Sequence, residues 1–105
     1  LDQGYFTVRS NRQTANVKLD ELLYLESLGD YIEFQLENGS KISSKEKISH
    51  MEKELPDSFL RIHRSFIVNK AKISSFTREY VMMGETELPI SRSYKQKALG
   101  KLQGN

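Results

Sequence analysis

Basic side chains alternate with core-type residues in the stretch SFLRIHRSFIVNK, residues 58–70. Its cationic or near-cationic groups are Arg61, His63 and Arg64, and an arginine buried without a partner is costly. The apolar residues should therefore face a core, and the basic residues should face a surface. Arginine is also well suited to recognise guanine, because its planar fork matches O6 and N7 together. The chemistry that this stretch offers is recognition of anions or bases.

Enzymes and metalloproteins need sets of residues that this sequence lacks. It has two histidines and no cysteine among 105 residues, so a zinc-type site would lack its usual ligands. No glycine-rich phosphate loop, nucleophile elbow or zinc-protease motif occurs in it. We therefore expect no catalytic residue, no metal and no cofactor. The absence of cysteine fits a reducing compartment, and we expect a cytoplasmic protein.

Charge is distributed unevenly along the chain, although the net charge is only +2. Residues 1–40 hold three basic residues against seven acidic ones, whereas residues 41–105 hold thirteen against seven. A basic C-terminal portion suggests an anionic partner. The same lysines are also compatible with an ordinary solvated surface, so charge alone leaves both interpretations open.

The length of the chain suits one domain, which we expect to span residues 1–105. The sequence starts at Leu1 rather than Met, and we expect it to be the C-terminal fragment of a longer protein. No run of 18 or more apolar residues occurs, so we expect no membrane contact in this domain.

Patterns of period two predict a mostly β domain with nine or ten short strands. Leu28-Gly29-Asp30 is typical of a turn, and Asn38-Gly39 predicts a two-residue hairpin turn. The strands are expected at residues 5–9, 16–19, 22–27, 31–36, 41–43, 59–63, 72–77, 80–83 and 86–90.

Two short helices are expected beside these strands. Ser43 with Glu46 three residues later has the pattern of a capping box, and apolar residues at helical spacing follow it. This predicts a helix over about residues 44–55, ended by Pro56. Ser91 is expected to cap a second helix over residues 92–102.

Four segments resemble, in order and spacing, the LytTR DNA-binding domain, the effector half of bacterial response regulators of the LytR/AlgR/AgrA type. The segments are DELLYLESLGDYI (20–32), the helix end ELP (54–56), FLRIHRSFIVN (59–69) and LPISRSY (88–94). The resemblance covers roughly residues 4–103. It implies an elongated arrangement of small antiparallel sheets with two short helices and no recognition helix.

The resemblance also implies a function in a two-component system. It implies sequence-specific binding of double-stranded DNA, as the effector domain of a transcriptional regulator, by loops that enter successive major grooves. The expected partners are DNA with direct repeats, a second copy of the domain on that DNA, and an N-terminal receiver or sensor domain outside this chain.

Two contact regions follow from the signature and the closing motif. Arg64 comes just after a strand, at a position that contacts bases in the family. Arg92 matches the arginine of the closing motif, which contacts a base. Ser91 is expected to be a helix cap first and a phosphate ligand second. Lys95 lies one turn after Arg92 and is expected to be either a phosphate contact or a solvated side chain.

The third contact loop of the family corresponds to residues 28–31. Asp30 would repel phosphate, although it can accept a hydrogen bond from cytosine N4, and Tyr31 can donate to a phosphate. Arg61 and His63 share one face of a strand, where they either support the reading loop or contact DNA. His63 is expected to be a structural histidine or, when protonated, a phosphate donor. Asn69 is expected to be a structural turn former.

A second class of function stays open from the sequence, namely a β-rich protein-interaction or ligand-sensing module without DNA binding. The acidic residues 1–40 could form its binding surface. Steep salt dependence of duplex binding separates the two readings, because each neutralised phosphate steepens it.

Overall fold

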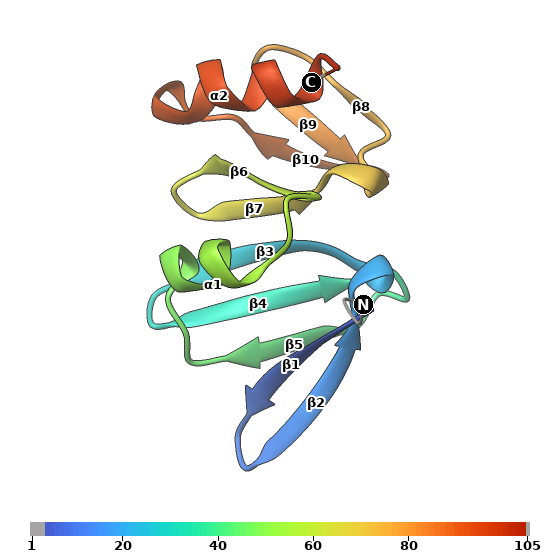
Figure 1. The fold of residues 1–105 in the computed structure, drawn as a ribbon, viewed down its shortest axis with the longest axis vertical. Helices are drawn as coiled ribbons and strands as arrows, with labels where there is room; N and C mark the ends of the chain where they lie inside the picture. Colours follow the sequence, from blue (N-terminus) through green and yellow to red (C-terminus); the bar gives the residue numbers. More distant parts are fainter. Residues whose placement is uncertain (1–3, 105) are drawn as a thin grey trace.

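The computed structural model describes residues 4–104 as a mostly β protein whose strands form three antiparallel sheets (Figure 1). Its principal dimensions are 40 × 30 × 26 Å. The strands are β1 (Tyr5–Ser10), β2 (Gln13–Lys18), β3 (Leu22–Leu28), β4 (Tyr31–Leu36), β5 (Lys41–Ser44), β6 (Phe59–His63), β7 (Phe66–Asn69), β8 (Ser75–Phe76), β9 (Tyr80–Met83) and β10 (Thr86–Pro89). The helices are α1 (Ile48–Glu54) and α2 (Arg92–Leu102), with short 3-10 turns at Leu19–Glu21 and Lys70–Lys72.

The central sheet has five strands in the order β5-β4-β3-β7-β6. In β4, the inward residues Ile32 and Phe34 are fully buried, as their alternation with polar residues predicts. They pack in a core with residues of α1 and with Val8 and Val17 of the β1–β2 hairpin. Burial of each such side chain stabilises the fold by about 1.5–3 kcal/mol, so the hairpin and α1 are held on this sheet mainly by apolar contact.

A second core lies between the β6–β7 pair, α2 and the sheet of β10-β9-β8. Ile67 belongs to the first core and its neighbour Val68 to the second, because adjacent strand residues point to opposite faces. Strand β7 is therefore covered on both faces. The β6–β7 hairpin joins the two cores and fixes their relative position.

The first helix differs from its prediction. It begins at Ile48, Lys47 occupies its N-cap, and no side chain caps it. The predicted capping box is wrong because Ser43 lies in β5 opposite Glu33. The next residue, Ser44, donates its hydroxyl hydrogen bond to the carbonyl oxygen of Arg9. The serines thus belong to the sheet, and the three residues after them form a loop rather than a helical turn.

Three further details differ from the sequence patterns. The strands around Asn38-Gly39 end at Leu36 and resume at Lys41, so four residues connect them rather than two. Strand β7 was not predicted separately. The strand expected over residues 72–77 is reduced to β8. Lys72 belongs instead to a 3-10 turn, which the side chain of Asn69 starts by accepting a hydrogen bond from the Ala71 amide. The second helix is confirmed at Arg92–Leu102.

Candidate nucleic-acid interface

Three connections lie along one edge of the molecule: the β3–β4 turn, the β6–β7 turn and the start of α2 (Figure 1). Backbone hydrogen bonds join them. The Ser27 amide at the end of β3 donates to the Ser65 carbonyl oxygen at 2.9 Å, and the Ser91 amide donates to the Ile62 carbonyl oxygen at 2.9 Å. The sheet therefore holds the three predicted contact regions in fixed relative positions.

The β6–β7 turn exposes Arg64 and is braced by Arg61. The Arg61 guanidinium donates from Nε to the His63 carbonyl oxygen at 2.8 Å and from Nη2 to the Arg64 carbonyl oxygen at 2.7 Å. Its Nη1 pairs with Glu52 at 2.7 Å, and only 10% of its side chain is exposed. Its guanidinium also lies over the ring of Tyr94, 5.1 Å from the centroid. Of the two roles expected for Arg61, this geometry favours support of the reading loop.

His63 takes part in the same turn. Its Nδ1 accepts a hydrogen bond from the Ser65 amide at 3.0 Å, and its ring packs against Phe66 with the centroids 5.3 Å apart. Partial burial, and then the positive charges of Arg64 and Arg61, lower the pKa of His63. The lowered pKa favours the neutral ring, which carries its proton on Nε2 because Nδ1 accepts a hydrogen bond. It stabilises the turn through Nδ1 and can still donate from Nε2 to a phosphate oxygen.

The start of α2 presents Arg92, which is exposed. Ser91 occupies the N-cap position but its side chain makes no capping bond, and its buried hydroxyl oxygen has no hydrogen-bond partner. The expectation that the Ser91 side chain caps this helix is therefore wrong. Lys95 pairs with Glu79 at 2.8 Å, and this ion pair lowers the pKa of the Glu79 carboxyl. The charge of Lys95 is thus partly neutralised within the protein.

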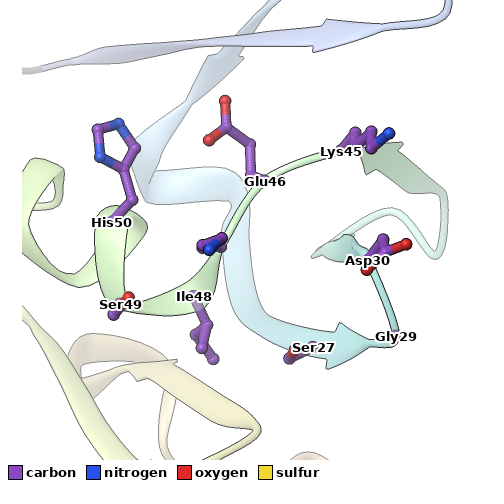
Figure 2. Close-up of a pocket in the computed structure, with 9 residues that line it drawn as sticks. Ser27, Gly29, Asp30, Lys45, Glu46, Ile48, Ser49 and His50 are labelled. Carbon is purple, nitrogen blue, oxygen red and sulfur yellow. The ribbon is translucent and has the colours of Figure 1, made fainter.

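The β3–β4 turn exposes Asp30 and Tyr31, and Gly29 adopts a left-handed φ of 60° there. The sequence patterns did not reveal that a second loop lies beside this turn. Residues of the β5–α1 connection, including Lys45 and Lys47, line a hollow of about 610 Å³ together with Gly29 and Asp30 (Figure 2). The pattern that predicts a helix from residue 44 includes both lysines, so it gives no sign that they belong to a loop.

Metal sites and membrane spans are two other features that the described residues could form. Within residues 4–104, no group of three or more His, Asp or Glu side chains is placed to hold a metal ion. No helix in this part of the chain is long and apolar enough to cross a membrane.

Comparison with known proteins identifies the family to which the chain belongs. Residues 12–103 match the family described as the LytTr DNA-binding domain. The sensory transduction protein LytR of Staphylococcus epidermidis is 29% identical over 101 residues, covering 82% of this chain and 40% of that protein. The sensory transduction protein LytT of Bacillus subtilis is 42% identical over 59 residues, covering 50% of this chain and 24% of that protein. This chain therefore spans less than half the length of these relatives.

A solved structure is similar over almost the whole chain. It is a LytTr DNA-binding domain from Bacillus cereus, with a TM-score of 0.77 and 28% sequence identity, covering 97% of this chain and 98% of that one. Its fold and the matched family confirm the predicted arrangement of small antiparallel sheets with two helices. The family is a non-enzymatic, DNA-binding one, as the sequence predicts. The chain belongs to the LytTR family of DNA-binding domains and is of the kind that serves as the effector of transcriptional regulators.

Proposed function

We propose that this domain recognises specific double-stranded DNA sequences by inserting loops of this edge, namely the β3–β4 turn, the β6–β7 turn and the start of α2, into successive major grooves. The observation that carries the proposal is the pair of exposed arginines, Arg64 and Arg92, on two connections of one edge that are joined by the Ser91–Ile62 hydrogen bond. The long axis of the molecule measures 40 Å, which exceeds one helical turn of B-DNA, about 34–36 Å. The two ends of a molecule of this length can reach neighbouring grooves.

Each side chain has a role that follows from its chemistry. Arg64 and Arg92 donate to guanine O6 and N7, which an arginine fork matches. Asp30 accepts from cytosine N4 in the β3–β4 turn, and Tyr31 donates to a phosphate beside it. The remaining candidates, Ser91, Lys95 and His63, contact the sugar-phosphate backbone, and Arg61 orients the turn that carries Arg64.

The regulator containing this domain acts, in this proposal, in the cytoplasm on operators with direct repeats. Each repeat binds one copy of the domain. The relatives that this chain matches are much longer than it and include proteins described as sensory transduction proteins. An N-terminal receiver or sensor domain would place DNA binding by this edge under the control of a signal.

Selection from a pool of random duplexes tests the proposal. The selected duplex and a scrambled one are then titrated by fluorescence anisotropy at several salt concentrations. Tight, salt-sensitive binding to a repeated motif, with much weaker binding to the scramble, is the expected result. Equal affinity for both duplexes, even with two domains joined in tandem to raise the effective concentration, would exclude sequence-specific recognition. It would favour the protein-interaction alternative if the salt dependence were also absent.

A further inference from the structure

We propose that the loop between β5 and α1 is an additional phosphate-binding surface, in which Lys45 and Lys47 contact the DNA backbone. This inference rests on the DNA-binding role of the edge described above and adds a fourth segment to it. Neither lysine belongs to the three contact regions that the family resemblance implies.

The position of the loop is the first argument. The end of β5 and the start of α1 lie on the same edge as the β3–β4 and β6–β7 turns (Figure 1). The 610 Å³ hollow is lined on one side by the β3–β4 connection and on the other by residues 45–50. Figure 2 shows Lys45 and Asp30 at one end of this hollow and His50 at the other. A duplex seated on the β3–β4 turn would therefore pass directly over this loop.

The second argument is charge. Lys45 and Lys47 are exposed. Ion pairs within residues 4–104 engage Lys41, Arg61, Lys72 and Lys95, but neither of these two lysines. Their charges are thus available to an external anion. Asp30 and Glu46 line the same hollow and repel phosphate, and the two lysines offset that repulsion.

The third argument is continuity with the β1–β2 hairpin. A second hollow, of about 300 Å³, is lined by Arg9 and Asn11 of the hairpin together with Tyr31 and Lys45. The Ser44 hydroxyl, at the end of β5, donates a hydrogen bond to the Arg9 carbonyl oxygen in β1. Lys45 therefore borders both hollows and lies between the β3–β4 turn and the hairpin. The hairpin turn carries a further exposed cation, Arg12, so positive charge continues along this part of the molecule.

The chemistry of lysine defines what the surface does. An ammonium group acts as a point charge that suits phosphate, and contacts to phosphate fix position without reading sequence. Each neutralised phosphate adds about 0.9 to the slope of log affinity against log salt concentration for duplex DNA. Two lysine contacts should therefore contribute roughly two to that slope, on any DNA sequence.

A comparison of two double variants tests the inference. Lys45→Gln with Lys47→Gln removes the proposed contacts, and Lys18→Gln with Lys101→Gln removes the same number of charges elsewhere. The control lysines are exposed and lie at the end of β2 and in the last turn of α2, both on the opposite side of the molecule (Figure 1). Each protein is titrated with a selected and a scrambled duplex across a salt series. The first pair should lower the slope by roughly two on both duplexes, and the control pair by less than about one.

The experiment distinguishes failure of this inference from failure of the proposed DNA-binding function. Equal slopes for the two double variants would overturn this inference and leave the roles of Arg64 and Arg92 untouched. If the parent protein binds no duplex at all, the DNA-binding function fails, and this inference fails with it. Thermal denaturation checks that the variants stay folded. If the double variant does not fold, the single Lys45→Gln and Lys47→Gln variants decide the question, each with an expected loss of about one in slope.

Discussion

The Arg61 guanidinium donates a hydrogen bond of 2.7 Å to the carbonyl oxygen of Arg64. A second bond from the same guanidinium, to the His63 carbonyl oxygen, measures 2.8 Å. Because a guanidinium is planar and its donors are fixed relative to one another, these bonds hold the β6–β7 turn in one geometry. One arginine of the signature thus positions the backbone from which the other projects. The two arginines therefore have different roles, since Arg61 holds the turn and Arg64 projects from it.

Replacement of Arg61 by lysine should destabilise the domain, because an ammonium group cannot satisfy both carbonyls and Glu52 in the same geometry. We expect the free energy of unfolding to fall by roughly 1–3 kcal/mol, measured by urea denaturation. Binding to a selected duplex should weaken more than binding to a scrambled one, because Arg64 loses its fixed orientation. The control is Glu52→Gln, which removes the charge of the Arg61 partner but leaves the two bonds from Arg61 to the turn carbonyls in place. Equal destabilisation by the two variants would contradict the bracing role of Arg61.

Replacement of Arg64 or Arg92 by alanine should weaken specific binding without unfolding the protein, since both side chains are exposed. The expected loss for each is roughly 1–3 kcal/mol on a selected duplex. Arg64→Lys should keep most of the nonspecific affinity but lose discrimination, because lysine has no bidentate fork. Anisotropy titrations of matched and mismatched duplexes measure both effects, with Lys101→Ala as the control. A variant that binds the selected site as tightly as the parent would refute the assignment of that contact.

Acidification should destabilise the fold through His63. Its pKa is lowered in the folded protein by partial burial and by Arg64 and Arg61, whereas the pKa of a histidine in an unfolded chain is about 6.5. The unfolded chain therefore takes up the proton more readily, so the contribution of His63 to stability is present at neutral pH and is lost as the pH falls below that value. Urea denaturation at about pH 7.5 and about pH 5.5 should show this loss.

His63→Asn provides the comparison for this pH effect. An asparagine at this position can still accept the Ser65 amide, but it does not titrate. The difference in stability between the two pH values should shrink in this variant and persist in His50→Asn, which keeps His63. An unchanged difference in His63→Asn would show that other groups cause it.

Asn69 is a buried polar residue, and its removal should be costly for stability alone. Its Nδ2 donates to the Leu22 carbonyl oxygen at 2.8 Å, and its Oδ1 accepts from the Ala71 amide at 3.1 Å. Asn69→Ala leaves the buried Leu22 carbonyl oxygen without this partner, at a cost of roughly 1–3 kcal/mol, and also removes the bond to the Ala71 amide. The exposed Asn38→Ala should cost less than about 1 kcal/mol, although Asn38 also bonds Ser40. Similar denaturation midpoints for the two variants would contradict this role for Asn69.

The sequence predicts best those elements that bury only one face, because their apolar residues then follow a single regular spacing. Strand β4 lies at the predicted residues, because strict alternation places Ile32 and Phe34 in the core. Strand β7 gives no alternation, because Ile67 and Val68 are buried in different cores. The start of α1 was misplaced because Ser43 pairs with β4, a contact distant in sequence from the helix pattern.

The residues of the candidate site also differ in how well the sequence predicts them. Arg64 and Arg92 lie within motifs, so their positions could be predicted from the residues and the family resemblance. The bracing by Arg61 depends on three partners that only the fold brings together. No sequence pattern identifies Lys45 and Lys47 as loop residues, because the helix is predicted to begin before them. Errors at element boundaries thus hide surface residues even when the fold class is right.

Ser91→Ala separates two functions of a residue at a helix start. A capping serine typically contributes about 0.5–2 kcal/mol, but the Ser91 hydroxyl makes no cap bond and its oxygen is buried without a partner. We therefore expect a change in unfolding free energy of less than about 0.5 kcal/mol, or slight stabilisation, because alanine removes an unpaired polar atom. If this hydroxyl turns to a phosphate oxygen in the complex, DNA affinity should fall on both selected and scrambled duplexes. Loss of stability with unchanged DNA affinity would instead show that Ser91 acts as a helix cap in solution.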